Sequence, residues 1–268
     1  MLELLEQLFR QVRGYMQSER FNRHEVFFES PEHVTMQFDR EAEDLIIEGL
    51  AASGYGFEII TEERPLTCTV ERPAYRIVVD PVDGSTNVAH GILTAGVALA
   101  VLPIDAPVTP EHVEWALVGE LYSGTVYQSE RGQGAFCNGR RCLVSSVKHY
   151  KDCLAGINLD QRDPSSLRGL LSMDPLPAAV RRSGSSAMDV VYVANGAYDA
   201  YIDIGDIITG ESFLASAAIV REAGGIVTDR RGQPLPQIEN LRQGFSLVAA
   251  ATRELHSEIL ERIDVDAK

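Results

Sequence analysis

The chain has 268 residues, 45% of them hydrophobic and 24% charged, so it can bury a large core in one domain or two. A formal net charge of −15 argues against nucleic acid and against anionic membranes as partners. The sequence contains no apolar run near the roughly 20 residues that a membrane span needs. The start, MLELLEQLFR, is acidic and amphipathic, which is not typical of a signal peptide. The four cysteines form no C-x-x-C pair, so we expect reduced thiols in a cytoplasmic protein.

The first elements that we predict are two helices with an extended segment between them. Residues 1–16 carry leucines, Val12 and Met16 at helical spacing, and residues 34–36 favour extended structure. A second helix follows Asp39, which we expect to be its N-cap, and it ends at Gly54. From the residues alone, a capping role for Asp39 is favoured over a catalytic one.

The central stretch runs from Tyr75 to Asn87 and reads YRIVVDPVDGSTN. Its β-branched residues 77–79 predict a buried strand that ends in a turn at Pro81. Asp80 and Asp83 supply carboxylates, which are the hard oxygen ligands that Mg²⁺ prefers. Residues 85–87 are all good N-cap types, and a helix N-terminus can bind an anion. A cation beside an anion site suits the chemistry of phosphate esters.

Two other interpretations of this stretch exist, and a neighbouring segment helps to judge them. An Asx-rich surface turn explains DPVDGSTN about equally well when the string is considered alone. An EF-hand loop is excluded, because position twelve, counted from Asp80, is Gly91 rather than Glu. A predicted strand at 57–60 leads to Glu62, which alone would be assigned to the solvated surface. A two-metal site, however, needs more carboxylates than Asp80 and Asp83 supply, and Glu62 is a candidate.

The rest of the chain divides near Lys151 into a first half, 1–150, and a second half, 151–268. In the first half we predict strands at 95–103, 115–121 and 125–128. The glycine-rich segment 130–140 that follows is interpreted as a β-meander connection rather than a dinucleotide site. In the second half we predict strands at 154–159, 200–204 and 247–250, a short helical stretch within 162–174, and helices at 187–196, at 212–223 and after Thr252. Arg181 and Arg182, before a Ser/Gly-rich helix start, suit either a second anion site or an ordinary capped helix.

Several motifs, taken in order, cover nearly the whole chain and resemble the inositol monophosphatase family, whose superfamily includes fructose-1,6-bisphosphatases. The family pattern D-P-hydrophobic-D-G-T/S-x-N matches 80–87, and the second residue of G-E-E matches Glu62. The early aspartate before an A-E helix matches Asp39. The remaining matches are G-x-V-Y at 124–127, R-G-x-G-A-F-x-N-G at 131–139, R-x-x-G-S-x-A ending at Ala187, and E-A-G-G at 222–225.

The chain departs from the family at one position that matters. A W-D-x-A-A or T-D-x-A-A signature lies ten residues before the Glu of E-A-G-G, and its aspartate completes the metal cluster. Here that position is Ser212, preceded by Glu211. A hydroxyl is a poor substitute for a carboxylate on Mg²⁺. Glu211, or the more distant Asp206, is a candidate to replace the missing ligand; without one, the resemblance implies a weakened or non-catalytic relative that binds a phosphorylated ligand or a partner.

The resemblance implies an Mg²⁺-dependent phosphomonoester hydrolase, with Mn²⁺ as the alternative ion, that acts on a small inositol or sugar phosphate with a metal-activated water. It implies metal ligands at Glu62, Asp80, Asp83 and the Val82 carbonyl, and we add Glu211 as the candidate replacement for the missing aspartate. Backbone N–H groups of Gly84, Ser85 and Thr86 are expected to bind phosphate. Glu62 and Ser85, with Asp39 as a further catalytic candidate, are expected to orient and deprotonate the water, and Gly184, Ser186 and Asp203 to contact the polyol. The implied fold is one continuous α/β/α/β/α sandwich, and the implied assembly is a homodimer.

Overall fold

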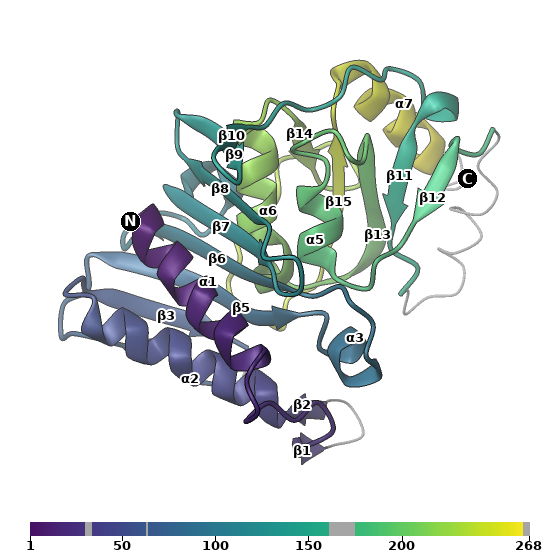
Figure 1. Cartoon of the computed structure of the whole chain (residues 1–268). Helices are drawn as coiled ribbons and strands as arrows, with labels where there is room; N and C mark the ends of the chain where they lie inside the picture. The colour runs from purple at the N-terminus through teal and green to yellow at the C-terminus, as the bar shows by residue number, and fades with distance from the viewer. Residues whose placement is uncertain (30–33, 63, 161–174, 265–268) are drawn as a thin grey trace.

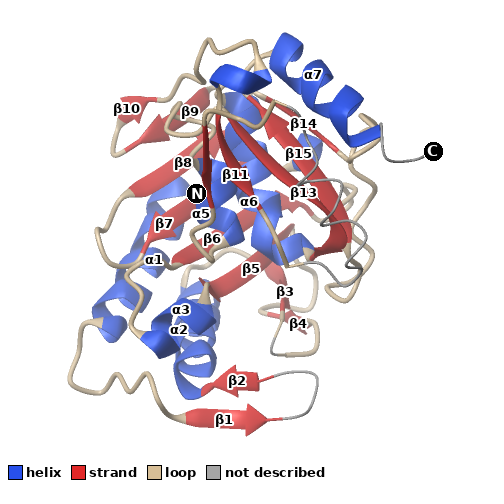
Figure 2. Cartoon of the chain, turned by 90° about the vertical axis from the view of Figure 1, so that its right-hand side faces the viewer, coloured by secondary structure: helices blue, strands red, loops and turns tan. Residues whose placement is uncertain are grey.

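The computed structural model describes residues 1–29, 34–62, 64–160 and 175–264, and it arranges them in alternating layers of helices and sheets (Figures 1 and 2). The helices are α1 (Leu2–Met16), α2 (Gln37–Ala52), α3 (Ser85–His90), α5 (Ser186–Val191), α6 (Gly210–Glu222) and α7 (Arg253–Asp264). Within the described ranges, none of them is long and apolar enough to cross a membrane.

The larger sheet has eight strands, in the order β10-β9-β8-β7-β6-β5-β3-β4. In chain order they are β3 (Phe57–Thr61), β4 (Thr67–Cys68), β5 (Tyr75–Asp83), β6 (Gly96–Pro103), β7 (Trp115–Glu120), β8 (Val126–Glu130), β9 (Gly134–Cys137) and β10 (Arg140–Arg141). Helices α1 and α2 cover one face of this sheet, as Figure 1 shows, and α6 packs on the other face.

The smaller sheet has five strands in the order β12-β11-β13-β15-β14. These are β11 (Leu154–Ile157), β12 (Ala179–Arg181), β13 (Ala200–Ile208), β14 (Ile226–Thr228) and β15 (Phe245–Ala250). Helices α5 and α6 lie between the two sheets, and α7 covers the outer face of the smaller one (Figures 1 and 2). A separate two-stranded antiparallel sheet pairs β1 (Val26–Glu29) with β2 (Val34–Met36). The α/β/α/β/α sandwich predicted from the sequence is therefore confirmed.

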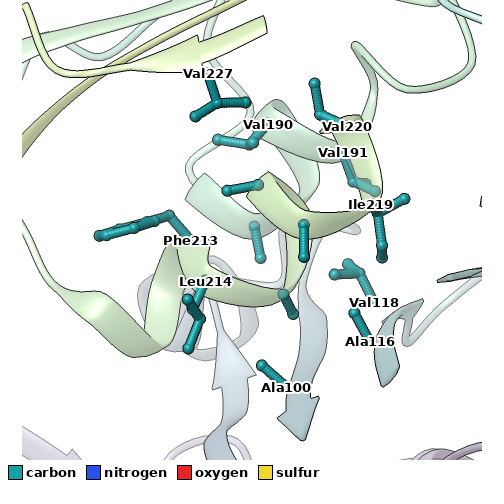
Figure 3. Packing of buried hydrophobic residues seen from close by; sticks show 14 of the residues in the cluster. Ala100, Ala116, Val118, Val190, Val191, Phe213, Leu214, Ile219, Val220 and Val227 are labelled. Carbon is teal, nitrogen blue, oxygen red and sulfur yellow. The ribbon is translucent and has the colours of Figure 1, made fainter. Parts of the chain in front are cut away.

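Buried hydrophobic side chains fill the spaces between these layers. The stripe of α1, including Leu5, Leu8 and Val12, packs with α2 against the larger sheet. Between the sheets, α5 and α6 contribute residues such as Val190 and Phe213, which belong to one buried cluster with Ala116 and Val118 of β7 (Figure 3). Because both faces of α6 pack against a sheet, this helix is apolar nearly all round, and its start is held firmly between the layers.

The predicted first helix, the meander at 130–140 and most strands are confirmed, but several boundaries were wrong. Helix α2 begins at Gln37 directly after β2, so Met36 is the N-cap. Asp39 instead occupies the third helical position and accepts a hydrogen bond from the Met36 N–H at 3.1 Å. Strand β5 continues through Pro81 to Asp83, with an irregular register between Asp80 and Asp83.

Three further expectations at helix ends or strands also need correction. Gly84, with φ +100°, is the N-cap of α3, so residues 85–87 lie inside that helix. Helix α5 ends at Val191, because turns occupy the chain up to Gly196. Strand β13 extends to Ile208, and strands β12 and β14 were not predicted. The helical stretch expected within 162–174 lies outside the described residues.

Candidate active site

Strand pairing brings the predicted carboxylates of the first half to one edge of the larger sheet. Strands β3 and β5 are parallel, and Thr61 is paired with Val79. The next residues, Glu62 and Asp80, therefore leave the two strands side by side. Asp39 joins them from the first turn of α2, which packs on the same strands.

These carboxylates form one electrostatic cluster that also includes the start of α6. The side chains of Asp39, Asp80, Asp83 and Glu211 are at most 8% exposed, whereas Glu62 is exposed. Burial raises the pKa of Asp80 well above its ordinary value, and the charges of Asp83, Glu62, Glu211 and Asp39 raise that pKa further. The structure thus brings together five acidic residues that are remote along the chain.

Asp83 is directed toward the start of α5. Its Oδ2 accepts hydrogen bonds from the Ser185 hydroxyl and, at 2.7 Å, from the Ala187 N–H. Burial raises the pKa of Asp83 to about 7, although these two hydrogen bonds favour the charged form. The predicted metal ligand therefore also ties the central motif to the second half of the chain.

The Ser85 hydroxyl lies between two acceptors. It is 2.6 Å from Asp39 Oδ1 and 2.8 Å from the Val82 carbonyl oxygen. A hydroxyl donates only one proton, and donation to a carboxylate is the stronger, charge-assisted choice. Asp39 is thus in direct contact with the central motif, which the interpretation as a simple helix cap did not anticipate.

The start of α6 supplies Glu211 and Ser212. The Ser212 hydroxyl donates to Asp80 Oδ2 at 3.2 Å. Glu211 is 3% exposed, and its Oε1 accepts from the Thr209 hydroxyl, while its buried Oε2 has no hydrogen-bond partner among the residues that the structure describes. Burial raises the pKa of Glu211 to about 7. Asp206 lies elsewhere, in an ion pair with Arg230 at 3.0 Å, so the structure does not bring it into the cluster.

The composition of the cluster fits a hard divalent cation. Crowded carboxylates and a buried carboxylate oxygen without a partner are the donors that Mg²⁺ and Mn²⁺ take, and a cation would relieve their mutual repulsion. As they stand, however, no three Asp, Glu, His or Cys side chains among the described residues are arranged to hold one ion together. Both Asp80 and Asp83 accept hydrogen bonds from hydroxyl groups instead.

The predicted phosphate-binding residues pack directly against the 183–187 segment. A Cβ on Gly84 would lie 3.3 Å from the Ser185 Cβ, and one on Gly184 would lie 2.7 Å from Asn87 Oδ1. Asn87 donates to the carbonyl oxygens of Thr94 and Ser183, both at 2.8 Å. Gly84, Ser85 and Thr86 stand at the start of α3, where backbone N–H groups have no partner within the helix.

The residues predicted to contact the polyol lie near the same junction. Asp203 is fully buried and accepts from Asn158 Nδ2 at 2.8 Å and from the Gly205 N–H at 3.0 Å. Burial raises its pKa to about 6. Ser186 is the first residue of α5 and hydrogen-bonds with the Tyr201 side chain.

Sequence reasoning missed one residue that positions the cluster. Glu43 is fully buried and accepts from the Thr61 hydroxyl at 2.8 Å and from Arg64 Nε at 2.6 Å. These bonds hold both sides of the loop that carries Glu62. The available signal was a glutamate on the apolar side of a predicted helix, next to Ala42, where a charge needs a buried partner.

Comparison with known protein families agrees with this arrangement. The model of the inositol monophosphatase family matches residues 2–265 of the chain. The chain belongs to the inositol monophosphatase family.

Individual relatives agree with the family assignment. A fructose-1,6-bisphosphatase/inositol-1-monophosphatase from Methanothermobacter thermautotrophicus is 32% identical, over 86% of this chain and 84% of its own. Inositol monophosphatase 2 from Rattus norvegicus is 33% identical, over 81% and 73%. The crystal structure of the extragenic suppressor protein suhB from Bartonella henselae has a TM-score of 0.79 at 26% identity, and covers 98% of this chain and 96% of its own.

Proposed function

We propose that this protein is a phosphatase that hydrolyses the phosphate monoester of a small inositol or sugar phosphate and depends on Mg²⁺ or Mn²⁺. The observation that supports it most is the gathering of Asp39, Glu62, Asp80, Asp83 and Glu211 at one sheet edge. This edge lies beside the helix start that follows Gly84, so acidic oxygens for a cation adjoin amides for an anion.

Each predicted residue has a defined task in this proposal. Glu62, Asp80, Asp83 and the Val82 carbonyl would hold the cation, which when bound offsets phosphoryl charge and lowers the pKa of water. Backbone N–H groups of Gly84, Ser85 and Thr86 would bind phosphate oxygens. The net charge of −15 means that the whole molecule repels an anionic substrate, so the cation and these N–H groups are needed to attract it locally.

The Ser85–Asp39 pair would orient the attacking water. While Ser85 donates to Asp39 at 2.6 Å, its oxygen keeps lone pairs that accept a hydrogen bond from water. A proton leaving the water could then pass to Ser85 as the Ser85 proton passes to Asp39. Glu62 offers a second acceptor at the exposed side of the cluster.

On the substrate side, the polyol would contact Gly184, Ser186 and Asp203. Both Asp203 oxygens already accept one hydrogen bond each, and a carboxylate has further lone pairs that can accept from a hydroxyl. Gly184 and Ser186 lie on the 183–187 segment, which Asn87 and Asp83 tie to the phosphate side, whereas Asp203 lies on β13. Binding of the two ends of a substrate would therefore be coupled through one packed junction.

A second candidate function is binding of a phosphorylated ligand or a partner with weak or no turnover. The observation that favours it is Ser212, which donates to Asp80 where the family pattern has a metal-binding aspartate. This candidate predicts saturable ligand binding without release of inorganic phosphate.

Phosphate release separates the two candidates. We expect hydrolysis of inositol-1-phosphate, fructose-1,6-bisphosphate or adenosine 3′,5′-bisphosphate that requires Mg²⁺. In Asp83→Asn we expect hydrolysis to fall by at least about a hundredfold, because the variant loses a ligand charge. Exposed Asp105→Asn is the matched control and should keep full activity. Wild-type protein that binds these compounds without any turnover would contradict the phosphatase proposal.

The substitution Ser212→Asp tests how far the departure from the family limits the rate. We expect faster turnover than in the wild type, because a carboxylate binds Mg²⁺ better than a hydroxyl. Steady-state rates at saturating Mg²⁺ measure the effect. An unchanged or slower rate would contradict this account of position 212.

A further inference from the structure

The start of α6 offers a carboxylate next to the position where the family pattern has one. Glu211 and Ser212 are the second and third residues of α6. Successive side chains on a helix point about 100° apart around its axis, so Glu211 starts from a different direction than a residue at 212. A glutamate is one methylene longer than an aspartate, and the extra length helps it to reach the same cluster. Glu211 is 3% exposed, so its side chain lies inside the molecule rather than in solvent.

Glu211 is incompletely satisfied as the structure stands. Its Oε1 accepts from Thr209, but its Oε2 is buried and has no hydrogen-bond partner within the described part of the chain. A buried carboxylate oxygen without a partner is costly, and a bound cation would stabilise it. The next residue, Ser212, hydrogen-bonds to Asp80, so the start of α6 lies against a predicted ligand.

Ser212 already has a different partner. Its hydroxyl donates to Asp80 Oδ2 at 3.2 Å, which fixes one oxygen of that carboxylate. As a hydroxyl, Ser212 adds no negative charge of its own, so Glu211 supplies the carboxylate at the start of α6.

We infer that Glu211 is a ligand of the divalent cation in place of the aspartate expected at 212, and that Ser212 orients Asp80. This inference rests on the proposed function, since it assigns a ligand to the same cation site. The carboxylate that the family pattern has at position 212 is then supplied by the preceding residue of α6. The number of carboxylates around the cation is therefore the same as in the family pattern.

Binding of Mn²⁺ alone tests the inference without reference to catalysis. Isothermal titration and the electron paramagnetic resonance signal of free Mn²⁺ measure affinity and stoichiometry in the absence of substrate. We expect Glu211→Gln to lose at least about tenfold in Mn²⁺ affinity, or one equivalent of bound ion. We expect the double variant Glu211→Gln/Ser212→Asp to regain the lost binding, because it returns one carboxylate to the start of α6.

Two controls keep the result interpretable. Glu120→Gln is a matched control, since Glu120 is 6% exposed and also has one buried oxygen that no described residue hydrogen-bonds. It should bind Mn²⁺ as the wild type does. In EDTA, Glu211→Gln should unfold at the same temperature as the wild type or higher, because an unpaired buried charge is removed, and this excludes misfolding as the cause of lost binding.

The outcomes separate this inference from the proposed function. Unchanged Mn²⁺ binding in Glu211→Gln, with binding lost in Asp83→Asn, would overturn the role of Glu211 alone. A loss that the double variant does not regain would also overturn it, because the carboxylate would then matter only for local packing. Absence of Mn²⁺ binding in the wild type would overturn both this inference and the proposed function.

Discussion

At the scale of single residues, the candidate site consists of buried carboxylates whose pKa values are raised. Asp80, Asp83, Asp203 and Glu211 are all buried, and burial is the largest cause of the raised pKa of each. Such groups oppose folding when charged, unless a cation or hydrogen bonds compensate. Clustered carboxylates of raised pKa are typical of functional sites. We therefore assign these residues a functional role rather than a stabilising one.

Asp203 gives a prediction about pH at this scale. Its folded-state pKa of about 6 lies above the ordinary 3.8, so the folded protein binds this proton more tightly than the unfolded chain. The resulting destabilisation is absent below about pH 4, grows up to about pH 6 and is complete above that. Asp203→Asn removes this titration. Its melting temperature relative to wild type should therefore rise between pH 4 and 6 and level off above.

Thermal unfolding of both proteins in EDTA from pH 4 to 8 measures this difference. The exposed Asp105→Asn is the control, and its difference from wild type should show no such rise. A difference for Asp203→Asn that stays flat across the range would contradict the assigned shift.

At the scale of elements, an irregular strand allows two carboxylates to meet. On a regular strand, residues three apart point to opposite faces. The register of β5 against β6 is irregular between Asp80 and Asp83, a stretch that includes Pro81, and the charges of the two residues lie close enough to affect one another. The prolyl residue cannot donate a ladder hydrogen bond, so the strand departs from regular pairing there.

Asn87 gives a prediction about how elements are joined. It is 6% exposed and donates from α3 to the carbonyls of Thr94 and Ser183, so it links the two halves of the chain. Asn87→Ala removes both bonds, and we expect it to lower the free energy of unfolding by about 1–3 kcal/mol. Urea unfolding measures the loss. The exposed Asn22→Ala should change stability far less, and equal losses would refute the joining role.

The whole molecule is held together by α5 and α6, which lie between the two sheets (Figure 1). Phe213 of α6 is fully buried there and forms an edge-to-face contact with Phe245 of β15, with ring centroids 5.2 Å apart. Because Glu211 and Ser212 adjoin Phe213, the packing that joins the sheets also positions the site.

Phe213→Ala tests this dependence. The lost burial and the remaining cavity should lower the free energy of unfolding by about 3–5 kcal/mol. The exposed Leu93→Ala, at 71% exposure, serves as the control in the same urea titrations. Similar small losses in both variants would show that this packing does not hold the sheets together.

The sequence alone determined the local features of this protein and the family resemblance. Hydrophobic periodicity predicted α1, α7 and most strands, because side-chain spacing along the chain reflects which face is buried. The order of the motifs predicted the layered fold and the family. The D-P-V-D-G-S-T-N stretch identified the candidate site, because it matches the family pattern and combines two carboxylates with N-cap residue types.

Tertiary structure alone decided which distant groups meet. The hydrogen bonds of Ser85 to Asp39, of Asp83 to the start of α5 and of Ser212 to Asp80 join residues 46 to 132 positions apart. Local propensity contains no information on such pairs, since they depend on strand register and on helix packing between the sheets. The tertiary structure also changed the role that the sequence had indicated for a single residue. Asp39 became the partner of Ser85 because β2 runs straight into α2, which puts the helix start three residues earlier than propensity indicated.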